Sequence, residues 1–168
     1  IVSGQSESAM NFSQHDRLDL RSNLSTEKPL SILFVTTDDL LWVEQLEEQS
    51  PSEEQLQLIA AMARSVRGRT VRCTHRQFLW PPRNGPELDI VSGESLDMLS
   101  GYMQRMIADH KCKYVIRLGS CEKLPALNLP FDDIPSSSDM LHDGVSKRAA
   151  WSVLRRRFRS SEDAYGNG

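Results

Sequence analysis

The sequence has few cysteines, and none of them is paired by a close spacing. Cys73, Cys112 and Cys121 are the three cysteines in 168 residues, and no two form a CxxC motif. An odd and widely spaced set argues against a disulfide framework and fits a reducing compartment. No apolar run approaches the roughly 20 residues that span a bilayer, and the N-terminus lacks the apolar stretch of a signal peptide. We therefore expect a cytoplasmic protein.

The sequence also lacks the common motifs of nucleotide enzymes and hydrolases. It contains no GxGxxG, Walker A, GxSxG or HExxH pattern, and no internal repeat is visible. A net charge of −3 does not favour binding to nucleic acid over the whole surface. These absences point away from catalysis by a known template.

Two Cys/His pairs are the candidate metal ligands. Cys73 and His75 would lie on the same face of a strand, and His110 and Cys112 repeat the spacing. Brought together, the two pairs could form a tetrahedral zinc site. The spacing is looser than in zinc ribbons, and cysteine is a common core residue. We therefore expect neither a metal nor a cofactor.

What the chain does contain is typical of one globular domain, with 39% hydrophobic and 26% charged residues. Residues 1–29 are polar, so we expect a flexible peptide there, with Met10 as a natural start. Residues 30–160 form the predicted domain, and residues 161–168 a flexible tail. Apolar anchors in the first segment are few: Phe12, Leu18, Leu20 and Leu24.

The order of strand and helix patterns predicts an α/β fold. Leu30–Thr36 is a continuous apolar run, typical of a strand buried on both faces. Thr70–His75 and Lys113–Leu118 are further strand candidates, and Cys121–Pro135 is a proline-rich connection. With helices between these strands, we expect a single domain with a largely parallel central sheet and helices on both faces.

Two helices have clear boundary signals. Ser50 is the expected N-cap of the first, with Pro51 at its first position, Glu53 closing a capping box and Gly68 ending it. The second is expected from Gly93 to His110. Its expected buried stripe consists of Leu96, Leu99, Met103, Met106 and Ile107.

Two acidic residues, Asp38 and Asp39, follow the first strand. In an open parallel sheet, ligands bind at the carboxyl ends of the strands, so these carboxylates are candidates for acid–base or metal chemistry. A role in a turn or a helix cap is the favoured interpretation.

The last helix is expected from Asp143, its N-cap, through the Arg-rich run at residues 155–159. The expected apolar stripe is Val145, Ala149, Trp151, Leu154 and Phe158. The three tryptophans are Trp42, Trp80 and Trp151. For each, a role as a core anchor is the favoured interpretation and a role as an interface residue is the alternative.

The segment Asp139–Leu154 (DMLHDGVSKRAAWSVL) resembles the C-terminal motif of the psi subunit of bacterial DNA polymerase III holoenzyme. Six residues occupy the places of that motif: Met140, Asp143, Lys147, Arg148, Ala149 and Trp151. Ile32–Leu40 and Val115–Gly119 are similar to two strands of the family. The family's N-terminal peptide carries a Leu-Gly-Ile and Trp signature that this sequence lacks.

The resemblance implies a non-catalytic clamp-loader accessory protein of bacterial DNA replication. It implies a body similar to uracil-DNA glycosylases without their activity. The implied partners are the chi subunit, single-stranded DNA-binding protein through chi, and the tau/gamma subunits. The implied partner-binding residues are Leu18, Leu20, Arg21, Leu24, Lys147, Arg148 and Trp151.

Two alternatives stay open. One is a regulator that binds another protein, such as a division inhibitor, because such a protein would also lack catalytic motifs. The other is a divergent glycosylase-like enzyme acting on nucleic acid, with Asp38 or Asp39 activating water and the Arg-rich run contacting phosphates.

Overall fold

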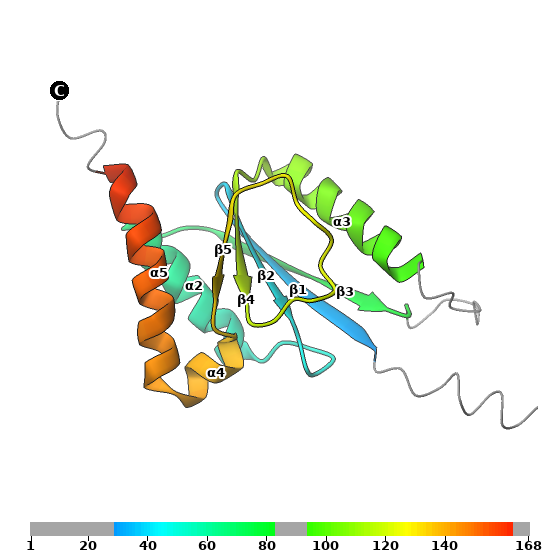
Figure 1. Ribbon diagram of the computed structural model, residues 1–168, viewed down its shortest axis with the longest axis horizontal. Helices are drawn as coiled ribbons and strands as arrows, with labels where there is room; N and C mark the ends of the chain where they lie inside the picture. Colours follow the sequence, from blue (N-terminus) through cyan, green and yellow to red (C-terminus); the bar gives the residue numbers. More distant parts are fainter. Residues whose placement is uncertain (1–28, 83–93, 163–168) are drawn as a thin grey trace, which may run out of the picture.

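The computed structural model describes residues 29–82 and 94–162, which form five strands and four helices (Figure 1). Residues 1–28, 83–93 and 163–168 lie outside the described residues. They include almost all of the expected flexible peptide at residues 1–29 and most of the expected tail at residues 161–168. In chain order the elements are β1 (Leu30–Thr37), β2 (Leu40–Gln45), α2 (Glu53–Arg67), β3 (Cys73–Trp80), α3 (Glu94–His110), β4 (Tyr114–Leu118), β5 (Phe131–Ile134), α4 (Ser137–His142) and α5 (Gly144–Glu162).

The sheet is mixed, with the strand order β3-β1-β2-β4-β5. β2, β4 and β5 run parallel to one another, whereas β1 is antiparallel to both of its neighbours, β2 and β3. The prediction of an α/β domain is confirmed, but the prediction of a largely parallel sheet is wrong.

A tight turn at Asp38 and Asp39 explains the antiparallel pairing. Thr37 pairs with Leu40 across a connection of only these two residues, and Asp38 adopts a left-handed φ of 52°. A connection this short can only join antiparallel strands, because a parallel crossover needs a dozen residues or more. β2 was missed because its apolar residues, at positions 40–43, were not assigned to any element after the first strand. β5 was missed because it lies within the connection Cys121–Pro135.

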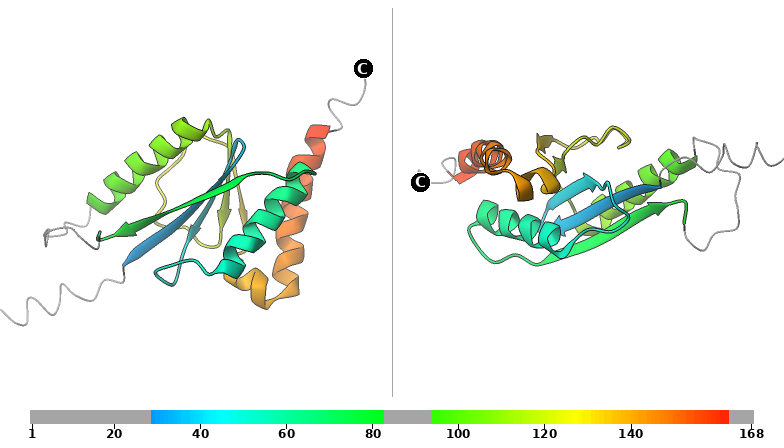
Figure 2. Two further views of the ribbon diagram at one scale, coloured as in Figure 1. Left: turned by 180° about the vertical axis from the view of Figure 1, so that it is seen from behind. Right: turned by 90° about the horizontal axis from the view of Figure 1, so that it is seen from below.

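Helices cover both faces of the sheet, as expected (Figure 2). Alternate residues of the central strands point to opposite faces. Leu33, Trp42 and Ile116 belong to a core with α2, α4 and α5, whereas Phe34, Val43 and Val115 belong to a core with α3. The full burial of β1 confirms that its apolar run is a strand covered on both sides.

The boundaries of α2 are partly as predicted. Gly68 ends the helix in the left-handed conformation, with φ 64°. The predicted cap is wrong: Ser52, not Ser50, is the N-cap, and Gln55, not Glu53, completes the capping box. The amide of Gln55 donates to Ser52 Oγ at 3.2 Å, and the amide of Ser52 donates to Gln55 Oε1 at 2.8 Å.

The remaining helix predictions are largely confirmed. Asp143 caps α5, because its carboxylate accepts the amides of Val145 at 2.9 Å and Ser146 at 3.3 Å. α3 begins one residue after its predicted start and buries Leu99, Met103 and Met106. The predicted stripe is wrong at its first position, because Leu96 is 42% exposed. Among the described helices, none is long and apolar enough to cross a bilayer.

Candidate partner-binding surfaces

The first candidate surface is the outer face of α5, which we call the α5 face and define by Lys147, Arg148, Trp151 and Arg155. Trp151 is 39% exposed, and the three cations are exposed around it. Residues three and four positions apart on a helix are neighbours, so Lys147 and Arg148 lie one turn before Trp151, and Arg155 one turn after it. The surface therefore combines an accessible indole ring with three positive charges.

The packing of α5 corrects the predicted apolar stripe. Ala150 and Leu154 are the buried residues that face the sheet, and Val153 and Phe158 pack beside them. Val145 is 61% exposed and Ala149 is exposed. The prediction failed because the stripe was drawn through Trp151, about 100° around the helix from Ala150. Because Ala150 and Leu154 face the sheet, the indole ring of Trp151 faces solvent.

A polar cluster beneath α5 attaches its last turns to the sheet. Asp132 on β5 accepts hydrogen bonds from the hydroxyl of Tyr114 and from Nε of Arg157, the latter at 2.9 Å. Burial is the main cause that raises the pKa of Tyr114 to about 12, and the charge and hydrogen bond of Asp132 add to it. The pKa of Asp132 is lowered: burial opposes ionisation, but the hydrogen bonds from Arg157 and Tyr114 outweigh it.

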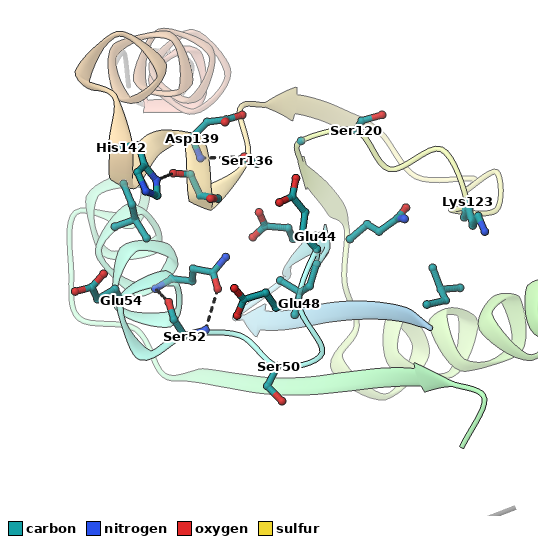
Figure 3. A pocket seen from close by; sticks show the side chains of 18 of the residues that line it. Glu44, Glu48, Ser50, Ser52, Glu54, Ser120, Lys123, Ser136, Asp139 and His142 are labelled. Carbon is teal, nitrogen blue, oxygen red and sulfur yellow. Dashed lines mark hydrogen bonds between the residues drawn. The ribbon is translucent and has the colours of Figure 1, made fainter. Parts of the chain in front are cut away.

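The second candidate surface is a hollow of about 870 Å³ at the edge of the sheet where β2, β4 and β5 end (Figure 3). We call it the acidic hollow. Its walls come from the β2–α2 loop, the start of α2, the β4–β5 loop and α4. Six carboxylates line it: Glu44, Glu47, Glu48, Glu54, Glu122 and Asp139. Among the described lining residues, only Lys123 and His142 can carry positive charge.

Glu44 is the most unusual residue of the acidic hollow. It is 3% exposed, and its Oε1 accepts the backbone amide of Ser137 at 2.8 Å. Its Oε2 is buried and has no hydrogen-bond partner. Burial is the main cause that raises the pKa of Glu44, the charge of Asp139 adds to it, and the nearby hydroxyl and backbone amide of Ser137 oppose it. A carboxyl group with one unsatisfied oxygen is costly to bury.

The wall around Glu44 is held by hydrogen bonds between helices. Gln55 Nε2 donates to Ser137 Oγ at 2.8 Å, which ties the first turn of α2 to α4. Ser136 caps α4 by accepting the amide of Asp139 at 3.0 Å. Because Ser136, Ser137 and Gln55 are all fixed by these bonds, the hollow has a preformed wall on the α2–α4 side.

Asp38 and Asp39 lie at the opposite edge of the sheet from the acidic hollow. Asp39 pairs with Arg67, and Asp38 pairs with Arg69 at 2.5 Å. The backbone carbonyl of Asp39 accepts the amide of Lys113, just before β4 begins. They therefore sit at the amino ends of the parallel strands, because β1 runs against them. The turn interpretation is confirmed, and the expected position at the ligand-binding edge is wrong.

The two Cys/His pairs are not brought together. Cys73 packs against the core shared with α2, and Cys112 lies in the core shared with α3, on the other face of the sheet. Within residues 29–82 and 94–162, no group of three or more Cys, His, Asp or Glu side chains is arranged to hold a metal ion. The zinc hypothesis therefore has no geometric support in this part of the chain.

The remaining tryptophans have structural roles. Trp42 is fully buried, and its Nε1 donates to Thr37 Oγ1 at 2.9 Å, which confirms its interpretation as a core anchor. Trp80 is half-buried and stacks on Phe78, with ring centroids 6.4 Å apart. Of the three, only Trp151 is substantially exposed.

Sequence reasoning brought out part of the candidate surfaces. Lys147, Arg148 and Trp151 are accessible on one helix face, whereas Leu18, Leu20, Arg21 and Leu24 lie outside the described residues. The acidic hollow was missed entirely. The signal for it is the density of acidic residues at Glu44, Glu47, Glu48, Glu53 and Glu54. The distant members, Glu122 and Asp139, could be added only once β4 and β5 were placed beside β2.

Comparison with known proteins gives no relative: no protein-family model matches the chain, and neither the curated proteins nor the solved structures contain a significant match to it.

Proposed function

We propose that this protein is a non-catalytic accessory subunit of the bacterial DNA polymerase III clamp loader. In this role it bridges the chi subunit, and through chi the single-stranded DNA-binding protein, to the tau/gamma subunits during DNA replication. The sequence resemblance of Asp139–Leu154 to the psi subunit supports the identity of these partners. A relationship to the uracil-DNA glycosylase fold, without its activity, is part of the proposal and has the same support.

The observation that carries the proposal is the exposure of Trp151 between cations on the α5 face. Trp and Arg are the residues most enriched among the energetic centres of protein interfaces. A singly exposed apolar side chain is common on a protein surface, but an exposed Trp flanked by Arg and Lys has the composition of an interface centre. Lys147 and Arg148 would then set the orientation of an acidic partner surface.

The described geometry offers less to the glycosylase alternative. Asp38 and Asp39 are engaged by Arg69 and Arg67 in a turn, and they lie far from the acidic hollow. That hollow is lined by carboxylates, which repel a phosphate backbone. The alternative of a protein-binding regulator shares the α5 face and differs only in the partner.

The test is co-purification of the full chain with chi and with tau/gamma from bacterial lysate. We expect the wild type to retain chi. The amount of chi retained by Trp151→Ala should be lower by about tenfold or more, as for a residue at the energetic centre of an interface. Met98→Ala is the matched control, because Met98 is a 57% exposed apolar residue on α3. A full chain with Leu18, Leu20 and Leu24 changed to Ala should lose tau/gamma and keep chi.

Two results would contradict the proposal. If neither chi nor tau/gamma is retained by the wild type, the clamp-loader assignment is wrong. If chi is retained equally by Trp151→Ala and Met98→Ala, the α5 face is not the surface that binds it.

A further inference from the structure

The acidic hollow goes beyond the proposed function, because it lies at the carboxyl edge of the sheet and does not include the α5 face. Six of its lining side chains are carboxylates, against Lys123 and His142 among the described lining residues. Glu47 and Glu48 are exposed at its rim, and Glu44 forms part of its inner wall. Figure 3 shows Glu44 and Glu48 between the start of α2 and the β4–β5 loop that carries Lys123.

A second observation, independent of the acidic cluster, points to a ligand. Glu44 is 3% exposed, lines the hollow, and has an Oε2 with no hydrogen-bond partner. Its Oε1 already accepts the amide of Ser137. A buried carboxyl oxygen without a donor is rare in folded proteins, and a donor supplied by a ligand would satisfy it.

The chemistry of the hollow favours a cation over an anion. Two amides at the start of α4, which could otherwise attract an anion, are occupied: Glu44 accepts the amide of Ser137, and Ser136 accepts that of Asp139. At the start of α2, Ser52 and Gln55 bond to each other in the same way. With these donors occupied, the six carboxylates give the hollow mainly acceptor capacity and negative charge.

The arrangement of the carboxylates favours a peptide over a metal ion. No group of three acidic, Cys or His side chains within the described residues converges on one point, as a metal ion requires. The carboxylates are instead spread around a space of about 870 Å³, large enough for several side chains. Serine hydroxyls at positions 50 and 138 line the same space and can donate to peptide carbonyls.

We propose that the acidic hollow is a docking site for an arginine- or lysine-rich segment of a partner protein. One basic side chain reaches the inner wall and donates to Glu44 Oε2, which is buried until the peptide binds. Others pair with Glu47 and Glu48 at the rim. These residues are separate from Lys147, Arg148 and Trp151. The docking site can therefore be tested independently of the α5 face.

The test uses the full-length protein and a fluorescent peptide of alternating arginine and glycine. Its control peptide has each arginine replaced by citrulline, which keeps the shape and removes the charge. We expect saturable binding of the arginine peptide, seen by fluorescence anisotropy, and no binding of the citrulline peptide. In an NMR titration the shifted amides should lie at residues 44–48, 120–123 and 136–142.

The variants separate the hollow from general negative charge. Glu47→Gln with Glu48→Gln should weaken peptide binding about fivefold or more, because two rim ion pairs are lost. Asp97→Asn with Asp109→Asn removes the same charge from exposed positions on α3, across the sheet, and should leave Kd unchanged. Glu44→Gln keeps an acceptor for Ser137 and should also weaken binding.

The proposal is overturned if the arginine peptide does not bind, if the citrulline peptide binds equally well, or if the α3 variant weakens binding as much as the rim variant. Competition identifies other occupants. If spermine or Mg²⁺ displaces the peptide at a concentration below the Kd of the peptide, the hollow is a site for a small cation. A self-association abolished by the rim variant would assign it to the basic α5 face of a second copy.

Discussion

The backbone amide of Ser137 donates a hydrogen bond to Oε1 of Glu44 at 2.8 Å, joining two residues that are 93 positions apart in the sequence. The bond connects the first turn of α4 to the end of β2. It also leaves Glu44 with one bonded and one unbonded oxygen in a buried position. This pair anchors the wall of the acidic hollow, and it has consequences for stability that can be measured.

The first prediction concerns Glu44 and pH. Burial raises the pKa of Glu44 above its ordinary value of 4.5, so the folded state holds this proton at pH values where the unfolded state has released it. The contribution to stability is therefore complete below pH 4.5 and decreases as pH rises through the folded pKa. Glu44→Gln has no proton to lose and should gain stability relative to the wild type as pH increases.

The measurement is the free energy of unfolding by urea between about pH 4 and pH 8. Glu44→Ala is the companion variant, because it leaves the buried amide of Ser137 without an acceptor and should cost about 1–3 kcal/mol. A difference between Glu44→Gln and the wild type that does not change with pH would contradict the raised pKa.

The second prediction concerns Tyr114, whose pKa of about 12 exceeds the ordinary value of 10. Because the folded pKa is raised, the contribution of this hydroxyl to stability is complete below pH 10 and is lost as pH rises from about 10 to about 12. Titration followed by ultraviolet absorbance should show a late tyrosine step. Tyr114→Phe should remove that step, and Asp132→Asn should move it to lower pH. An unchanged late step in Tyr114→Phe would assign it to another tyrosine.

The third prediction tests which serine caps α2. Ser52→Ala removes the acceptor for the amide of Gln55 and should cost about 1 kcal/mol of stability. Ser50→Ala is the matched control, since Ser50 does not cap the helix, and should change stability by less than about 0.5 kcal/mol. Urea unfolding of the two variants compares them directly, and equal losses would be inconsistent with the capping box at Ser52.

The fourth prediction compares two glycines. Gly119 has a φ of 69°, and a Cβ there would lie 2.9 Å from Cβ of Ser136. Gly119→Ala should therefore cost at least about 1–2 kcal/mol and disturb the start of α4. Gly101 lies within α3, where an added Cβ would meet no atom within 4 Å, so Gly101→Ala should gain about 0.5–1 kcal/mol. Thermal unfolding should show shifts of opposite sign.

Elements whose signals are local could be predicted from the amino-acid sequence. The apolar run of β1 identifies a strand buried on both faces, because a strand with one face in solvent alternates apolar and polar residues. The periodicity of α3 and the positions of Gly68 and Asp143 follow from backbone conformation and capping, which depend on a few neighbouring residues. Lys147, Arg148 and Trp151 were identified together through the resemblance of Asp139–Leu154 to the psi subunit, and the structure shows all three exposed on α5.

The direction of β2, the pairing of β5 and the side of α5 that faces the core depend on tertiary contacts and could not be predicted in this way. A two-residue turn at Asp38 and Asp39 reverses the chain, and this moves both carboxylates to the amino edge of the parallel strands. The choice between Ala150 and Trp151 as the buried residue of α5 depends on the space left by the sheet. The acidic hollow exists because the ends of β2, β4 and β5 meet at one edge, and strand pairing between distant segments is information that no local pattern carries.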